Sequence, residues 1–373
     1  MKNTYPKDEV INSYEQLMAT EKVEMEPAPG GRLQRKAEKK SPKPIRFLKR
    51  FFLYLTTLLA ALLICCVGII YIFAQGPSES ARNIFVASVT QTSAAKFTAH
   101  MFLSQEEVDR ILSENTVVDS GEISDGDLIT IGGGDEDYDL NALTIEEVSG
   151  STYKGKMMIV NDPSRVYVSA IPDFTVARGQ QVAQMAAREN AIAGINGGGF
   201  EDIAGLGKGA KAQGIVVSQG VWRNGSKNGE HQVIGFDDQD RLLIGTMTGT
   251  EAVEAGVRDA VAWGPLLVVN GQAMEVGDSG GGLNPRTAIG QRADGAVLLL
   301  VIDGRQTNSL GASYADLIEV MLEYGAVNAA NLDGGTSSSM VYEGEVITNV
   351  CSLYGERPLP TCFLVRRVED DVE

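Results

Sequence analysis

Histidine is scarce in this chain of 373 residues, and that scarcity limits its chemistry. His100 and His231 are the only two, too few for a His-rich metal centre or a relay of several imidazoles. His231 adjoins Glu230 at the start of an expected strand, which favours a surface position over a catalytic one. Basic residues are also outnumbered, 32 against 49 acidic ones, and the net charge of −17 argues against a non-specific nucleic-acid binder. Ser337 and its two following serines lack a G-x-S-x-G motif, which argues against a serine hydrolase.

Charge is absent from a long apolar run between Phe51 and Phe73. At about 1.5 Å of rise per residue this run would extend roughly 34 Å as a helix, enough to cross a bilayer core of about 30 Å. A buried core helix of that length would carry a polar stripe, and a cleaved signal peptide would have a shorter apolar region behind a shorter leader. The run therefore predicts a single transmembrane helix.

Basic residues gather on one side of this predicted span. Residues 32–50 contain nine Lys or Arg, whereas residues 74–93 contain only Arg82. By the positive-inside rule, the N-terminus lies in the cytoplasm and the C-terminal part outside the cell. Cysteine divides in the same way: Cys65 and Cys66 lie in the span, and Cys351 and Cys362 lie in the exported part, where a disulfide between them is expected.

Five parts follow along the chain. They are a basic cytoplasmic tail without fixed structure (1–50), the transmembrane helix (51–73), an extracellular stalk (74–142), a main domain (143–368) and a short tail (369–373). Ser104 and Glu107 resemble a capping box that opens a helix in the stalk. Eight acidic residues within 119–139 predict a solvated loop, because their spacing matches no EF-hand.

Short apolar runs separated by glycines predict a mixed, strand-rich α/β fold for the main domain. The predicted strands are 156–160, 166–171, 191–195, 215–218, 232–236, 241–244, 266–269, 297–302 and 327–332. Helices are expected over 176–190 and 313–324, the second with Ser313 as its N-cap and Gly325 as its stop.

Three predicted strands end in an amide or acid followed by glycine. Asn196 precedes Gly197 and Gly198, Asp303 precedes a glycine, and Asn331 and Asp333 precede Gly334, Gly335 and Ser337. The strands 297–302 and 327–332, with the helix between them, predict a βαβ crossover that makes them parallel neighbours. Asp303 and Asp333 would then lie roughly 5–10 Å apart at one edge of the sheet, a separation that suits glycoside hydrolysis.

Two arginines lie close to these aspartates in the sequence. Arg286 and Thr287 follow a run of three glycines, and Arg305 follows Asp303 after one glycine. Arginine binds phosphate through a two-pronged fork of N–H donors. Arginines beside aspartates therefore indicate a substrate that contains both a sugar and a phosphate.

The segments around these residues resemble the phosphodiester glycosidase family, which includes a lysosomal enzyme and bacterial members described as exopolysaccharide-related. The resemblance covers residues 143–368 and rests on 196–200, 264–265, 284–290, 303–305 and 331–337. It implies hydrolysis of a sugar-1-phosphodiester at the glycosidic bond. We predict no cofactor and no metal ligands. The resemblance implies Asp333, Asp303 and Asn196 as catalytic residues. The implied substrate-binding residues are Arg286, Arg305, Asn331, Thr287, Gly197, Gly198, Gly334, Gly335 and Ser337.

An anchor ahead of the domain points to a bacterial surface protein, so a phosphorylated glycan of a cell wall or capsule is the expected substrate. Three other functions remain open at this point. A non-catalytic module could recognise phosphoglycan through the same arginines, and a metal-dependent phosphodiesterase could use Asp303 and Asp333 as ligands. A structural part of an envelope assembly would use the stalk and the acidic loop instead.

Overall fold

The computed structural model describes residues 43–92, 95–134, 137–202, 208–277, 280–352 and 355–368. Most of the predicted cytoplasmic tail and the short C-terminal tail lie outside these ranges. The chain divides into two compact units, residues 1–62 and residues 63–373, and all described strands belong to the second.

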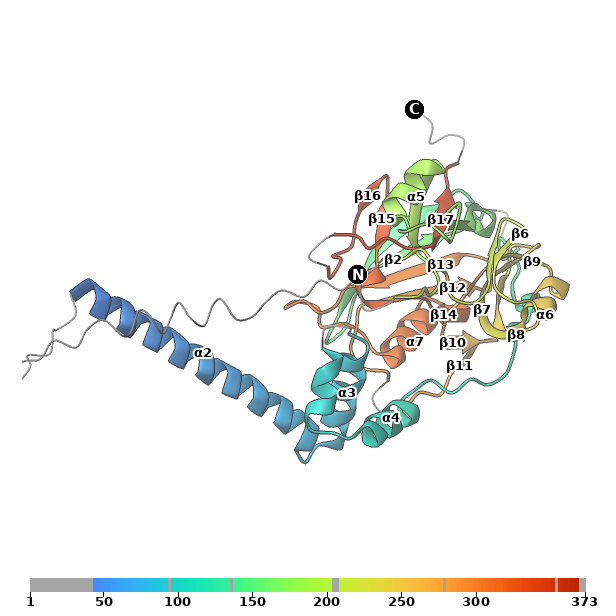
Figure 1. Cartoon of the computed structure of the whole chain (residues 1–373). Coiled ribbons are helices and arrows are strands. Elements are labelled where there is room, and N and C mark those ends of the chain that lie inside the picture. The colour runs from blue at the N-terminus through green and yellow to red at the C-terminus, as the bar shows by residue number, and fades with distance from the viewer. Residues whose placement is uncertain are drawn as a thin grey trace, which may run out of the picture. The chain divides into compact units, whose positions relative to one another are not determined.

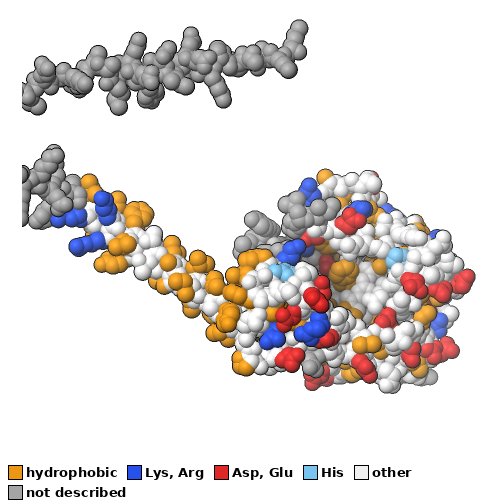
Figure 2. Space-filling model, turned by 60° about the horizontal axis from the view of Figure 1, so that its bottom comes forward, with side chains coloured by type: hydrophobic (Ala, Val, Ile, Leu, Met, Phe, Trp, Pro, Cys, Tyr) orange, Lys and Arg blue, Asp and Glu red, His pale blue; other side chains and the backbone are white. Residues whose placement is uncertain are grey.

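An apolar helix, α2, runs from Lys43 to Gln75. Hydrophobic side chains cover its surface and basic ones gather near its start, as Figure 2 shows. From Ile45 to Gln75 its length and composition suffice to cross a membrane, and only 6% of its most apolar window is buried within the protein. An apolar helix so little covered by the rest of the chain is a candidate membrane span.

Three short helical elements follow α2 and form a small bundle: α3 (Glu79–Thr90), the 3₁₀ helix η1 (Lys96–Met101) and α4 (Gln105–Glu114). Ser104 caps α4 by accepting a hydrogen bond from the amide of Glu107, as its sequence predicted. The bundle has its own apolar cluster, made of Ala74, Val86, Ala99, Leu103, Val108 and Ile111. The predicted stalk thus contains a packed bundle in addition to the expected helix.

Three antiparallel sheets make up the strand-rich part (Figure 1). The first has the order β1 (Leu143–Ser149), β2 (Lys154–Val160), β13 (Val297–Ile302), β12 (Arg286–Arg292), β14 (Ala326–Asn331), β10 (Leu266–Val269), β11 (Gln272–Ala273). The second has the order β16 (Glu345–Val346), β15 (Met340–Tyr342), β4 (Ala191–Asn196), β17 (Thr361–Arg366), β3 (Val166–Ala170). The third has the order β6 (Val221–Asn224), β5 (Val216–Ser218), β9 (Val257–Ala262), β7 (Glu230–Asp237), β8 (Leu242–Thr248).

One apolar core joins the three sheets. Met158 and Leu299 from the first sheet, Ile195 and Phe363 from the second, and Ile234 from the third belong to the same buried cluster. Strands buried on both faces read as continuous apolar runs, which is why the sequence revealed most of them. The mixed, strand-rich α/β fold is confirmed.

Helices are few and short in this part of the chain. They are α5 (Val182–Arg188), α6 (Gly249–Glu254) and α7 (Tyr314–Glu323), with the 3₁₀ helices η2 (Gly126–Leu128), η3 (Pro163–Arg165) and η5 (Gly335–Ser337). The helix predicted over 313–324 is present as α7, with Ser313 as its N-cap. The helix predicted over 176–190 is shorter than expected, because it starts only after Gln181.

The predicted neighbourhood of β13 and β14 is wrong in one respect. Both strands pair antiparallel with β12, so they run parallel to each other, but β12 lies between them. Their ends are therefore two strand spacings apart, roughly 10 Å, and Arg286 at the start of β12 occupies the gap. The reason is that the intervening helix crosses over β12, which the sequence places before both strands.

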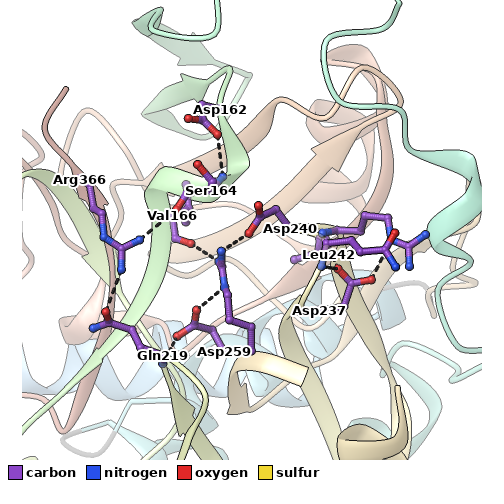
Figure 3. Close-up of polar contacts among 12 residues, drawn as sticks. Asp162, Ser164, Val166, Gln219, Asp237, Asp240, Leu242, Asp259 and Arg366 are labelled. Atoms are coloured by element: carbon purple, nitrogen blue, oxygen red, sulfur yellow. Dashed lines mark hydrogen bonds and ion pairs between the residues drawn. The ribbon is translucent and has the colours of Figure 1, made fainter. Parts of the chain in front are cut away.

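A buried polar network ties the second sheet to the third (Figure 3). Asp259 in β9 is fully buried and accepts hydrogen bonds from the amides of Val168 and Gln219 and from Arg258. Arg258 also bonds Asp240 and the carbonyl of Val166 in β3. Burial raises the pKa of Asp259. Arg258 pairs with Asp259 in the same strand and with Asp240 in the turn between β7 and β8, while their bonds to backbone groups of β3 join the two sheets. This is the arrangement expected of a structural ion pair.

Candidate active site

The end of β14 and the turn that follows it hold a concentration of unsatisfied polar atoms. Among the described residues, four buried side-chain oxygens here make no hydrogen bond: Asn331 Oδ1, Asp333 Oδ2, Ser337 Oγ and Ser338 Oγ. Buried polar atoms are almost always paired in folded proteins, so such a cluster requires an explanation. A site that receives its partners from a bound ligand and its waters provides one.

Asp333 is the chemically distinctive member of this turn. Burial raises the pKa of its carboxyl from the ordinary value to about 6. The Ser337 hydroxyl, the charge of Arg357 and the amide of Gly334 oppose that rise, although Ser337 falls short of ordinary hydrogen-bond geometry. A carboxyl group with a pKa near neutrality can take up or release a proton at physiological pH, which is the property that acid–base catalysis needs.

Glycine is required beside this carboxyl group. Gly335 has a φ of +65°, a left-handed conformation that residues with a Cβ rarely adopt, and a Cβ there would lie 3.4 Å from the guanidinium of Arg305. Its amide donates to the carbonyl of Pro285, and a Cβ on Gly334 would lie 3.0 Å from the same oxygen. The two glycines therefore bring the Asp333 turn against the segment that precedes β12 and against Arg305.

Arg305 connects this turn to a cavity. Its Nη2 donates to Asn284 Oδ1 (2.9 Å) and to the carbonyl of Gln91 (3.2 Å). The cavity has a volume of about 620 Å³ and is lined by Arg305, Gln306 and residues of 346–352 and 355–356. Asp333 does not line it. Arg305 is thus placed between the catalytic candidate and a space large enough for a substrate group.

Arg286 lies in a different environment from Arg305. It is only 3% exposed and donates to three carbonyls, those of Gly281, Gly282 and Ala312. A fourth donor, Nη1, bonds Gln91 Oε1 at 3.1 Å, and the guanidinium stacks on Tyr314 with 4.0 Å to the ring centroid. Four of its five N–H groups are therefore occupied, which leaves little capacity for the predicted phosphate.

Asp303 and Asp333 follow strands that are not neighbours in the sheet. Asp303 is 8% exposed, and its two oxygens accept hydrogen bonds from the amide and the side chain of Asn349, at 2.9 and 2.7 Å. Because β12 separates the strands, Asp303 faces the loop that lines the cavity. The expected separation of roughly 5–10 Å assumed neighbouring strands, whereas β12 lies between them.

Asn196 and Thr287 hold the Asp333 turn in place. Asn196 is fully buried, donates to the carbonyl of Asp333 (2.5 Å) and accepts from Thr287 Oγ1 (2.7 Å) and the amide of Ser339 (3.2 Å). The amides of Gly197 and Gly198 bond the backbone and hydroxyl oxygens of Thr361, at 3.2 Å each. All four residues predicted here lie near the site, but their polar groups already have protein partners.

The expected disulfide between Cys351 and Cys362 is wrong, because both cysteines are free. Cys362 in β17 is fully buried, with its sulfur 3.7 Å from that of Met185. Cys351 lies beside Arg305, and burial raises the pKa of its thiol although that arginine opposes the rise. Loop position suggested the pairing, but the strand carries Cys362 into the core.

Three residues near the site were missed by the sequence reasoning. Gln91 contacts both arginines, Asn349 holds Asp303, and Arg357 lies beside the Asp333 turn. None of them belongs to a motif, and Gln91 lies nearly 200 residues from its partners, so no local signal could have found it. Among the described residues, no group of three or more His, Cys, Asp or Glu gathers as a metal site.

Fold and site together define a strand-rich α/β domain with a buried carboxyl group beside arginines, an arrangement suited to an anionic substrate. Residues 189–366 match the model of the phosphodiester glycosidase family, so the chain contains a domain of that family. The resemblance noted in the sequence is confirmed.

Individual relatives agree with this assignment. The chain is 27% identical over 222 residues to the SPbeta prophage-derived protein YomE of Bacillus subtilis, covering 57% of this chain and 32% of that protein. It is 24% identical over 233 residues to mouse N-acetylglucosamine-1-phosphodiester alpha-N-acetylglucosaminidase, covering 54% of this chain and 42% of the enzyme. The chain therefore spans less than half the length of these relatives.

A solved structure shares the fold. It is the catalytic domain of the zebrafish N-acetylglucosamine-1-phosphodiester alpha-N-acetylglucosaminidase, auto-inhibited by its pro-peptide. The TM-score is 0.53 at 19% identity, over 66% of this chain and 88% of that domain.

Proposed function

We propose that this protein is a membrane-anchored glycosidase that hydrolyses the glycosidic bond of a sugar-1-phosphodiester outside the cell. The observation that carries this proposal is the Asp333 turn, where a carboxyl group with a pKa of about 6 lies among unsatisfied buried oxygens. The family domain and its likeness to a sugar-phosphodiester hydrolase supply the reaction class.

The reaction requires a carboxylate but little help from a strong acid. In the ionised form, Asp333 takes a proton from water or attacks the anomeric carbon itself. The bond between that carbon and the bridging oxygen breaks, and its electron pair leaves with the phosphate monoester. Oxygen from water ends on the sugar. Because a phosphate monoester is a weakly basic leaving group, little help from a general acid is required.

Arg305 is the substrate-facing cation in this scheme. It reaches both the Asp333 turn, through Gly335, and the cavity lined by residues of 346–356. A guanidinium in that position can bind the phosphodiester while the sugar lies toward Asp333. Arg286, Asn196 and Thr287 support the site from behind, because their donors and acceptors already bond protein groups.

The rest of the chain supports the proposed location and substrate. The apolar helix α2 with basic residues at its start supports an anchor whose N-terminus is cytoplasmic. The exported residues carry a large excess of acidic side chains, so an anionic polymer would be held by local cations rather than by the overall field. A phosphorylated glycan of the cell wall or capsule is the substrate we infer.

The test is to incubate the purified full chain, in detergent micelles, with UDP-N-acetylglucosamine and a panel of sugar-1-phosphodiesters. Each reaction is run with and without EDTA, and products are identified by mass spectrometry. We expect free sugar and a phosphate monoester, unaffected by EDTA. Sugar-1-phosphate that disappears with EDTA would replace this proposal with a metal-dependent phosphodiesterase. Retained binding without any product would replace it with a phosphoglycan-binding module.

A further inference from the structure

Arg357 lies beside the Asp333 turn although no sequence motif includes it. Its guanidinium stacks on Phe200, with 4.6 Å to the ring centroid, and Nη2 forms an ion pair with Asp202 at 2.5 Å. Nη1 donates to Thr336 Oγ1 at 3.2 Å, and the side chain is 17% exposed. Three supports of different kinds therefore fix this positive charge in one place, which is the condition for a preorganised electrostatic role.

The charge of Arg357 acts on Asp333. Thr336, the hydrogen-bond partner of Arg357, belongs to the same turn as Asp333. Two side-chain charges influence the pKa of Asp333: Arg357 lowers it and Asp202 raises it. Because Asp202 is bonded to Arg357, the two residues form an opposed pair beside one buried carboxyl group.

We propose that Arg357 is a positioning residue for Asp333. Its guanidinium, held by Phe200, Asp202 and Thr336, keeps a positive charge beside a carboxylate that the fold has removed from water. Asp202 moderates this charge and completes the arrangement. This proposal rests on the proposed function for its role in turnover, but the interaction between the three charged groups is a property of the protein alone.

Substitutions at Arg357 and Asp202 should shift the pH profile of kcat/KM in opposite directions. Arg357→Gln removes the positive charge, so the ionised form of Asp333 becomes less favourable and the acid limb of the kcat/KM profile moves to higher pH. Asp202→Asn leaves the guanidinium unopposed, so the limb moves to lower pH. An opposite charge close to a carboxyl group lowers its pKa by about 1–3 units, and we expect shifts near the lower end because both side chains are partly exposed. Arg357→Lys keeps the positive charge, so the acid limb of its kcat/KM profile should lie close to that of the wild type.

The experiment measures kcat/KM from pH 4 to 9 for the full chain and these three variants. Arg366→Gln is the matched control, because Arg366 also stacks on a ring, that of Tyr167, and bonds Gln219, away from the Asp333 turn. We expect its acid limb to coincide with that of the wild type. A uniform loss of activity in Arg357→Gln, with the limb unmoved, would overturn the proposal.

A second measurement does not depend on turnover. The protein is labelled with ¹³C at aspartate carboxyl groups, Asp333 is assigned by its loss in Asp333→Asn, and its titration is followed by NMR. Upward displacement in Arg357→Gln and downward displacement in Asp202→Asn are expected. If the wild type titrates identically to Arg357→Gln, the positioning role is wrong. If the displacements occur but no sugar phosphodiester is hydrolysed, the proposed function fails and the positioning role stands.

Discussion

The surroundings of Arg286 and the Asp333 turn differ in how completely their polar atoms are hydrogen-bonded. Arg286 is buried, stacked on Tyr314 and bonded to three carbonyls, and its Nη1 donates to the side chain of Gln91. The Asp333 turn, between Arg305 and Arg357, instead contains buried oxygens without hydrogen bonds to described residues. From the sequence, residues of both regions were predicted as site residues. The hydrogen bonds of Arg286 support the fold, whereas the unpaired oxygens of the Asp333 turn are why we propose that a ligand binds there.

The largest expected effect is on catalysis at the Asp333 turn. Asp333→Asn removes the group that accepts a proton or attacks the sugar, and we expect kcat to fall by roughly 10²–10⁴-fold or more. Turnover of the sugar-1-phosphodiester measures this effect, with circular dichroism to confirm folding. The matched control is Asp303→Asn, where the carboxylate bonds Asn349 and a smaller loss is expected. Equal losses in both variants would contradict the distinction between the two aspartates.

Removal of the satisfied arginine should affect stability more than chemistry. Arg286→Met removes a donor from three buried carbonyls, but those of Gly281 and Ala312 keep a second donor, from Gln91 and Asn284 respectively. The carbonyl of Gly282 is left without one, so we expect a destabilisation of about 1–3 kcal/mol. Arg305→Met, at a more exposed position, should cost about 1 kcal/mol and raise KM instead. Urea unfolding and steady-state kinetics of both variants test the pair. Similar stabilities for the two variants would contradict the larger structural role assigned to Arg286.

Asp333 should also be a source of instability at neutral pH. Its folded pKa of about 6 exceeds the ordinary value of 3.8, so its contribution to stability is greatest below pH 4 and is lost as the pH rises to about 6. Two pKa units correspond to at most about 3 kcal/mol. Asp333→Asn should therefore stabilise the fold at pH 7.5 and have little effect at pH 4. The urea midpoints of the wild type and the variant at the two pH values test this prediction. A lower midpoint for the variant at pH 7.5 would contradict it.

The smallest effect concerns the contact between the helical bundle and the arginines. Gln91 is an exposed residue whose side chain bonds Arg286 and the carbonyl of Gly281. Gln91→Ala removes these two bonds near the surface, and we expect a loss of about 1 kcal/mol in thermal unfolding. Gln105→Ala, which removes a bond between exposed side chains within α4, serves as the control and should lie within about 0.5 kcal/mol of the wild type.

Local sequence patterns were enough to predict the strand-rich fold, the apolar helix and the family. Each of these depends on local pattern: continuous apolar runs for buried strands, an uncharged run of membrane length, and polar residues followed by glycine at strand ends. Asp333 was predicted as a site residue in the same way, because its turn is a local motif.

Which charged groups meet depends on the packing of distant elements. The strand order placed β12, with Arg286 at its start, between β13 and β14, and β17 carried Cys362 into the core, where it is not bonded to Cys351. The contacts of Gln91 and Arg357 join segments that are distant along the chain or lack any motif. The physical reason is that hydrogen bonding and burial depend on which elements pack together, and local patterns do not encode the order of strands in a sheet.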